Sequence, residues 1–194
     1  LPCTPDGCST CGAPSPESCV CSVPPVFGSA RSVVVWAGPV RDLVLSLKYS
    51  RRWDLARPMG LAMAAMWRSN GFPAADVAAC VPLNWRRYLA RGYNQSWLLS
   101  AAFAGALGID ARSDMLVRRG SKGSTRGASR AERLEHAGYG ISTARGLDIR
   151  GRNVVLVDDV LTTGATEATC ARLLRDAGAA RVDVVTFARA TGGV

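Results

Sequence analysis

Apolar residues follow two alternating patterns along most of the chain. Short runs rich in apolar residues predict buried strands. Five such runs are present, at residues 31–37, 76–82, 112–118, 154–157 and 181–188. Apolar residues spaced by three and four positions predict amphipathic helices. Four segments have this spacing, at residues 39–49, 54–70, 90–107 and 166–177.

The alternation of strands and helices defines the fold class. A strand with no polar side chain, such as 154–157, is typical of a parallel sheet that helices cover on both sides. We therefore predict an α/β domain over residues 28–194. In sheets of this kind, ligands bind where loops leave the carboxyl ends of the strands.

Two segments follow neither pattern. Residues 1–27 are rich in Cys, Pro, Ser and Gly, which predicts a small knuckle built from loops that needs a staple. Residues 119–133 are basic and rich in glycine, which predicts a flexible loop.

The chain has 194 residues and a formal net charge of +9, and most of its basic side chains are arginine. Phosphorylated small molecules and nucleic acid are both suitable partners, although a solvated basic surface is the alternative. No apolar run is long enough for a membrane span, and the N-terminus lacks a signal-peptide pattern. We expect a cytoplasmic protein without membrane insertion. The first residue is Leu1 rather than Met, which leaves open whether residues precede it.

Two adjacent acids, Asp158 and Asp159, follow the predicted strand at 154–157. Carboxylates at the end of a buried strand are costly unless something uses them. The vicinal hydroxyl groups of a ribose are suitable partners, because each carboxylate oxygen accepts a hydrogen bond from a hydroxyl group. We therefore predict that these two side chains bind ribose.

The segment that follows the acids has the features of a phosphate site. Glycine allows a tight turn, and the first amide groups of the next helix point outward and favour an anion. The predicted phosphate-binding residues are Leu161, Thr162, Thr163, Gly164, Ala165 and Thr166. An ordinary strand–turn–helix is the alternative, but the whole pattern over 154–166 favours a ribose 5-phosphate site.

That pattern resembles the phosphoribosyl pyrophosphate (PRPP) motif of type I phosphoribosyltransferases. Over nearly its whole length the chain resembles the ComF family of competence-associated proteins, which are similar to amidophosphoribosyltransferase domains. The resemblance rests on Leu47-Lys48-Tyr49, Val81-Pro82-Leu83, Arg91-Gly92-Tyr93-Asn94-Gln95 and Ser129-Arg130-Ala131-Glu132-Arg133. It implies a type I phosphoribosyltransferase fold with a hood loop, and a role in DNA uptake.

The resemblance also implies where a pyrophosphate would bind. The loop at 82–87 would lie beside it, and 119–133 would be the hood loop. The predicted pyrophosphate and hood residues are Pro82, Leu83, Arg86, Arg87, Arg91 and Arg130, with Lys122 and Arg126 as further cations. Mg²⁺ would bind together with PRPP. The chain has Thr125 and His136 where relatives usually have Gln and Asn, which puts hood-loop chemistry in doubt more than PRPP binding.

Five of the seven cysteines lie in the first 21 residues. In a reducing compartment such a cluster favours a metal over disulfides. We predict a structural Zn²⁺ bound by Cys8, Cys11, Cys19 and Cys21, and Cys3 is an alternative ligand. A knuckle without metal is the other possibility.

Three functions remain open from the sequence. The first is an enzyme that transfers a phosphoribosyl group from PRPP, although no catalytic residue or acceptor is assigned. The second is a competence factor that binds single-stranded DNA or proteins of the competence machinery, with Trp85, Tyr88 and Tyr93 beside arginines. The third is a PRPP-sensing regulator on the same fold.

Overall fold

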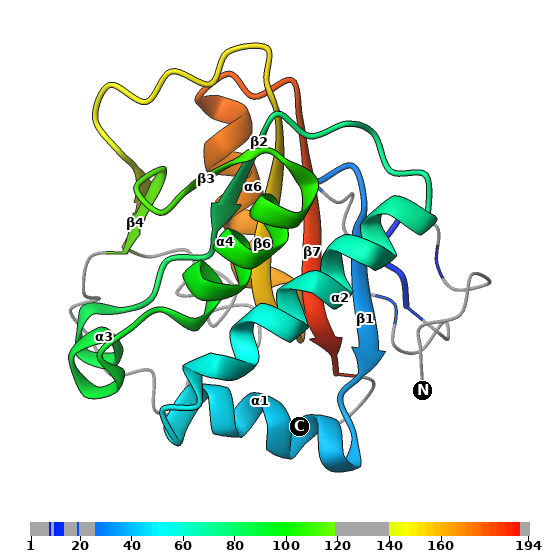
Figure 1. The fold of residues 1–194 in the computed structure, drawn as a ribbon. Helices are drawn as coiled ribbons and strands as arrows, with labels where there is room; N and C mark the ends of the chain where they lie inside the picture. Colours follow the sequence, from blue (N-terminus) through cyan, green and yellow to red (C-terminus); the bar gives the residue numbers. More distant parts are fainter. Residues whose placement is uncertain (1–7, 9, 14–18, 20–25, 119–139, 191–194) are drawn as a thin grey trace.

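The structure is a computed structural model, and it describes residues 8, 10–13, 19, 26–118 and 140–190. Its centre is a five-stranded parallel sheet with the order β1-β7-β6-β2-β3 (Figure 1). The strands are β1 (Ala30–Val35), β2 (Val77–Cys80), β3 (Asp110–Arg112), β6 (Asn153–Leu161) and β7 (Arg181–Arg189). A separate antiparallel pair consists of β4 (Leu116–Arg118) and β5 (Ile141–Thr143).

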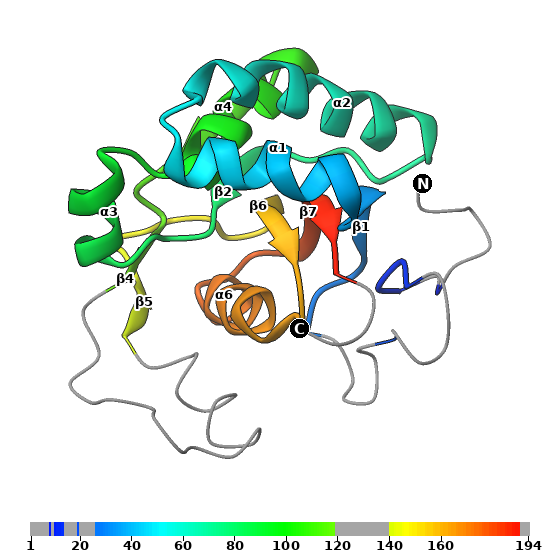
Figure 2. The same ribbon diagram turned by 90° about the horizontal axis from the view of Figure 1, so that it is seen from below.

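Helices cover both faces of the sheet. They are α1 (Gly38–Tyr49), η2 (Trp53–Leu55), α2 (Ala56–Ser69), α3 (Trp85–Arg91), α4 (Gln95–Leu107) and α6 (Ala165–Asp176). Figure 2 shows α1, α2 and α4 on one face and α6 on the other. Alternate residues of β6 serve the two faces: Val155 and Val157 pack in the core under α1, α2 and α4, and Val154 and Leu156 pack in the core under α6.

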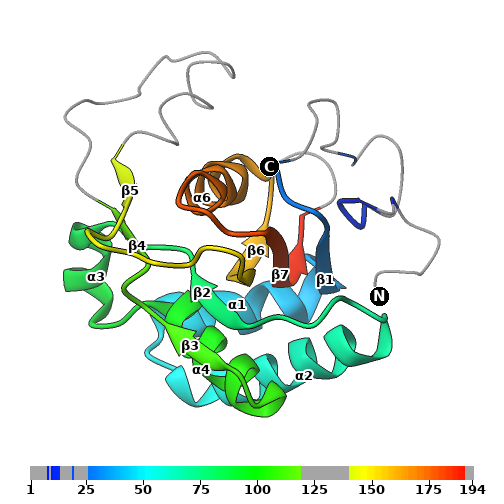
Figure 3. The same cartoon turned by 90° about the horizontal axis from the view of Figure 1, so that it is seen from above.

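The topology creates a crevice at one edge of the sheet. The chain leaves β2 through α4 to reach β3 on one side, and it leaves β6 through α6 to reach β7 on the other side. The two connections therefore diverge between β2 and β6, as the view in Figure 3 allows the reader to follow. Such a switch point leaves an opening at the carboxyl ends of the strands, where α/β proteins bind ligands.

The parallel sheet with helices on both faces confirms the prediction from the apolar pattern. The expectation of one helix over 90–107 was wrong, because the chain forms α3 and α4 there. Gly92 lies in the left-handed region with φ 83° and ends α3, and the Asn94 side chain then caps α4 by accepting a hydrogen bond from the Ser96 amide.

Three strands also differ from the expectation. The run at 112–118 divides between β3 and β4, which belong to different sheets. The strand at 154–157 continues to Leu161, because β7 pairs with it along that whole length. Asp158 and Asp159 are therefore residues of β6 and not of the loop after it. In the described part of the chain, no helix is both long and apolar enough to cross a bilayer.

Candidate functional site

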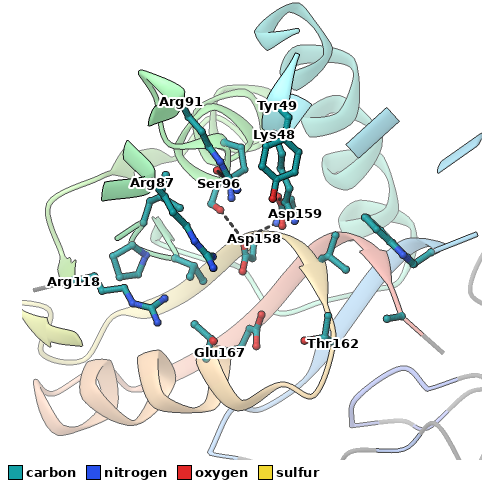
Figure 4. A pocket seen from close by; sticks show the side chains of 18 residues that line it. Lys48, Tyr49, Arg87, Arg91, Ser96, Arg118, Asp158, Asp159, Thr162 and Glu167 are labelled. Carbon is teal, nitrogen blue, oxygen red and sulfur yellow. Dashed lines mark hydrogen bonds and ion pairs between the residues drawn. The ribbon is translucent and has the colours of Figure 1, made fainter. Parts of the chain in front are cut away.

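A cavity of about 280 Å³ lies at the carboxyl ends of β1, β2, β6 and β7. Figure 4 shows how its side chains surround the end of β6. The structure brings together eight of the residues that the sequence singled out: Pro82, Leu83, Arg87, Arg91, Asp158, Asp159, Thr162 and Thr166. Residues far apart in the chain therefore meet at the switch point of the sheet.

Asp158 lies at the centre of this cavity and is nearly buried. Its Oδ1 atom accepts hydrogen bonds from Ser96 Oγ at 2.6 Å and from the Asp159 amide at 2.8 Å. Burial raises the pKa of Asp158 to about 6, and the neighbouring Asp159 carboxylate raises it as well. The side chain is thus held in one orientation from the α4 side.

Asp159 forms an ion pair with Lys48 from the end of α1, with 3.1 Å between Lys48 Nζ and Asp159 Oδ2. The pair is not aligned as a hydrogen bond, and Asp159 Oδ2 is buried without a hydrogen-bond donor among the described residues. The same ammonium group lies 5.8 Å from the centre of the Trp36 ring. A hydroxyl group in the cavity would give this oxygen the donor that it lacks.

The start of α6 has the features of an anion site. Gly164 occupies the N-cap position with φ 72°, and no described side chain caps the helix by accepting a hydrogen bond from its first turn. The amide groups there are left for an anion. Thr162 and Thr166 line the cavity, whereas Leu161 is buried in the core and Thr163 is exposed. Of the predicted phosphate segment, two residues therefore line the cavity.

Arginines form the rim on the side of α3 and β4. Arg91 Nη1 donates to Gln95 Oε1 at 2.8 Å, and its guanidinium lies 4.8 Å from the centre of the Tyr49 ring. Arg87 and Arg118 also line the cavity, and burial lowers the pKa of Arg118. Arg86 does not line it, and its guanidinium lies over the Trp85 ring instead.

Sequence reasoning missed several residues of the cavity. The main ones are Trp36, Lys48, Ser96, Arg118 and Glu167. Lys48 was recognised in the motif Leu47-Lys48-Tyr49, but it was given no role in the site. Glu167 gave no signal, since an acid in the first turn of a helix usually faces water. Arg130, of the predicted hood loop, lies outside the described residues.

The N-terminal cysteines form a second cluster. The sulfur atoms of Cys8, Cys11 and Cys19 lie within 4.8 Å of one another, and the Cys11–Cys19 distance is 3.7 Å. In a tetrahedral site with Zn–S bonds of about 2.3 Å, the sulfur atoms are about 3.8 Å apart. The Cys11–Cys19 distance therefore fits one edge of such a tetrahedron. A hydrogen bond from the Cys11 amide lowers the pKa of the Cys8 thiol to about 6. The three thiols could hold a metal ion, and Cys21 lies outside the described residues.

The cysteine cluster is attached to the sheet through β7. Arg189 is completely buried, and it donates a hydrogen bond to the Cys11 carbonyl oxygen at 2.6 Å and lies 3.6 Å from Cys11 Sγ. The next residue, Ala190, lines the main cavity. One strand end therefore contacts both clusters.

Comparisons with known proteins decide the family. The sequence model of the phosphoribosyl transferase domain matches residues 107–193. The chain is 32% identical over 192 residues to DNA utilization protein YhgH of Escherichia coli (strain K12), covering 94% of this chain and 83% of that protein. It is 31% identical over 157 residues to competence protein F of Haemophilus influenzae, covering 78% and 69% of the two chains. The chain belongs to the ComF family.

The ComF assignment agrees with the arrangement of the sheet and helices, which is that of a type I phosphoribosyltransferase fold. Among solved structures, the chain is similar to glutamine PRPP amidotransferase from B. subtilis, with 25% identity and a TM-score of 0.49, over 73% of this chain and 30% of that one. The residues of β6 and α6 that line the cavity of this ComF chain lie inside the segment that the domain model matches, whereas the lining residues of α1, α3 and α4 precede that segment.

Proposed function

We propose that the chain binds PRPP, or a related ligand with a ribose 5-phosphate group, and transfers its phosphoribosyl group. The observation that carries the proposal is that two buried acids of β6 line the same cavity as a helix start for which the described residues provide no side-chain cap. Asp158 and Asp159 would accept hydrogen bonds from the ribose hydroxyls. The amide groups of residues 162–166 would bind the 5′-phosphate.

The charges around the cavity support a pyrophosphate on its other side. Arg87 and Arg91 from α3 and Lys48 from α1 line the wall opposite α6. Fixed cations stabilise the charge that develops on a departing pyrophosphate. Pro82 and Leu83 would hold the ligand against this wall.

Mg²⁺ would enter with PRPP, held by pyrophosphate and ribose oxygens, and it would screen the charge of the leaving group. Arg87 and Arg91 line the wall where the pyrophosphate would lie, and they would balance the negative charge that the ion leaves on it. The transition state would be cation-like at the ribose C1, so the residues named here act by positioning groups and balancing charge.

The test is thermal unfolding, followed by circular dichroism, with PRPP and Mg²⁺. A ligand at one hundred times its Kd stabilises the folded chain by about 2.7 kcal/mol, which corresponds to about 5–10 °C for a domain of this size. We expect this shift for the unchanged protein. We expect no shift for Asp158→Asn plus Asp159→Asn, because both ribose contacts weaken.

A matched control removes two exposed carboxylates instead, with Asp42→Asn plus Asp176→Asn. The control should keep the full shift. The proposal would be refuted if PRPP did not raise the Tm of the unchanged protein, or if it raised the Tm of the site variant as much as that of the control.

We also propose that Cys8, Cys11 and Cys19 hold a structural Zn²⁺ with Cys21 as the fourth ligand. The distances between the three described sulfur atoms support it. Four thiolates fill every coordination position of the ion, so it would hold the segment at 1–27 together and take no part in catalysis. A cytoplasmic location, where thiols stay reduced, would suit this role.

A second candidate function is binding of single-stranded DNA. Exposed aromatic rings occur beside arginines at one corner of the molecule: Tyr49, Trp53, Trp85 and Tyr88 are between 50% and 68% exposed. One of these rings, Tyr49, also lines a cavity of about 200 Å³, together with Lys48, Arg51, Arg87, Ala90, Arg91 and Tyr93. Rings for stacking and cations for the backbone are the features of single-strand sites. The names of the relatives, DNA utilization protein and competence protein F, agree with it.

This candidate is tested by filter binding of an oligothymidylate at 50–300 mM salt. Loss of one stacked base costs about 1–3 kcal/mol, so Trp85→Ala plus Tyr88→Ala should weaken binding at least tenfold. Arg172→Ala, an exposed cation on α6, is the control that lowers the net charge on the other face of the sheet. Binding should fall with salt and survive the Asp158 and Asp159 changes. Equal affinity of the aromatic variant and the control would exclude this surface.

A further inference from the structure

Glu167 is a third acid in the main cavity. It lies in the first turn of α6 and is 3% exposed. Figure 4 shows it on the α6 side of Asp158, across the cavity from Lys48, Arg91 and Ser96. Among the described residues, no ion pair involves it. A buried acid without a cation is stable only when it keeps its proton.

The hydrogen bonds of Asp158 leave one oxygen for Glu167. Ser96 and the Asp159 amide both donate to Asp158 Oδ1, so Oδ2 is open to another donor. Glu167 and Asp158 are both buried and line the same cavity, and two carboxyl groups can share a hydrogen bond only if one of them carries a proton. Burial, and then the charge of Asp158, raises the pKa of Glu167 to about 8.

Other charged groups face the pair from several elements. They are Lys48 on α1, Arg87 on α3, Arg118 on β4, Asp159 on β6, Cys170 on α6 and Cys80 on β2. Lys48 is engaged by Asp159, and burial raises the pKa of both thiols, which keeps them neutral. The arginines keep their charge at any pH used here. Glu167 and Asp158 are therefore the pair whose charge changes near neutral pH.

The position of Glu167 matters for an anion at the helix start. It directly follows Thr166, which lines the cavity at the predicted phosphate site. An ionised Glu167 would place a third carboxylate beside a dianionic phosphate in a poorly solvated pocket, where like charges repel strongly. A neutral Glu167 avoids this repulsion and keeps Asp158 oriented.

Building on the proposed function, we propose that Glu167 is a positioning residue that keeps its proton, donates it in a hydrogen bond to Asp158, and makes binding of a ribose 5-phosphate group depend on that proton. When the proton is lost, the ligand must bind against a third negative charge. Affinity then falls as the pH rises. The amide of glutamine can replace the protonated acid at every pH.

The binding test uses ribose 5-phosphate in calorimetric titrations from pH 7 to pH 9.5. The second phosphate pKa is about 6, so the charge of the probe is constant over this range. A site that requires a proton with a pKa near 8 is only about one-tenth competent at pH 9. We expect the affinity of the unchanged protein to fall about tenfold from pH 7 to pH 9, and that of Glu167→Gln to stay within about twofold.

Asp176→Asn, at the exposed end of α6, is the matched control and should follow the unchanged protein. A merely structural Glu167 would leave the pH profiles of all three proteins alike. Parallel profiles would therefore overturn the proposal. So would a Glu167→Gln protein that binds as weakly at pH 7 as the unchanged protein does at pH 9.

Unfolding without ligand tests the proton separately. Because the folded pKa of Glu167 is raised, its stabilisation is complete below the unfolded pKa near 4.5 and is lost as the pH rises toward 8. Glu167→Gln should therefore have a higher Tm than the unchanged protein at pH 9 and an equal one at pH 5. Equal Tm values at pH 9 would refute the buried proton. If neither protein binds ribose 5-phosphate at any pH, the proposed function fails. The comparison of Tm values at pH 9 then decides whether Glu167 keeps its proton.

Discussion

Two helical glycines on neighbouring helices have opposite surroundings. A Cβ atom added to Gly60 on α2 would lie 2.5 Å from the Ala102 Cβ and 3.0 Å from the Leu99 carbonyl oxygen on α4. A Cβ atom added to Gly105 on α4 would meet nothing within 4 Å. A single methyl group therefore separates a tight helix contact from open space, although both sites favour alanine by helix propensity.

These glycines form a matched pair for mutation. Gly105→Ala should raise the free energy of unfolding by about 0.5–1 kcal/mol, the usual gain in an exposed helix. Gly60→Ala should lower it by about 1–3 kcal/mol, because the backbone of α4 must move away. Urea denaturation measures both changes. A stabilised Gly60→Ala protein would mean that α2 and α4 do not pack this closely.

The site residues differ in how far the sequence revealed them. Asp158 and Asp159 could be placed in the candidate site, because charges at the end of an apolar strand require a partner. The orientation of each acid could not be predicted, because the residues that hold them, Ser96 and Lys48, come from segments far away in the chain. Glu167 was missed because the sequence contains nothing to show that this turn of α6 faces a cavity.

The end of β7 connects the cysteine segment to the sheet. Arg189 is buried there and bonds to the carbonyl group of Cys11, and the Ala30 amide of β1 donates to Thr10 on the same segment. Contacts with Cys11 therefore fix a strand end whose next residue lines the cavity. A change in the cysteine segment would reach the edge of this cavity through one residue.

Removal of the proposed zinc ion should accordingly destabilise the folded chain. We expect one zinc ion per chain by elemental analysis, and a strong chelator should lower the Tm by about 5–10 °C, which corresponds to a loss of about 2–3 kcal/mol. Cys8→Ser should contain less zinc and show a smaller effect of the chelator. Cys170→Ala, which removes a buried thiol on α6, is the control and should keep the ion. Purified protein without metal, and with a Tm that the chelator does not change, would contradict the zinc assignment.

Helices and strands could be predicted where the apolar pattern was strong, as for α1, β6 and β7. The division between α3 and α4 was missed, although Gly92 and Asn94 are common helix-end and helix-start residues, because apolar spacing continued across them. The strand β5 was missed because it has three residues and pairs only with β4. Short strands depend on partners that local sequence does not specify.

At the scale of the molecule, the parallel order of five strands determines where chemistry is possible. All strands of the main sheet have their carboxyl ends at one edge, and the connections diverge between β2 and β6. The α/β class followed from the sequence, but the strand order did not, because pairing partners lie far apart in the chain. That order explains why polar residues of α1, α3, β4 and α6 meet around Asp158.

The position of Trp36 has a practical consequence. Its indole is part of the cavity wall, and the Lys48 ammonium group that lies 5.8 Å from the centre of its ring also pairs with Asp159. Indole emission responds to nearby charge and to water, so an occupant that draws the ammonium group away would change the light that this side chain emits. The chain has four other tryptophans, and Trp36 alone among them lines this cavity in the described structure. The fluorescence of Trp36 should therefore report whether the cavity is occupied.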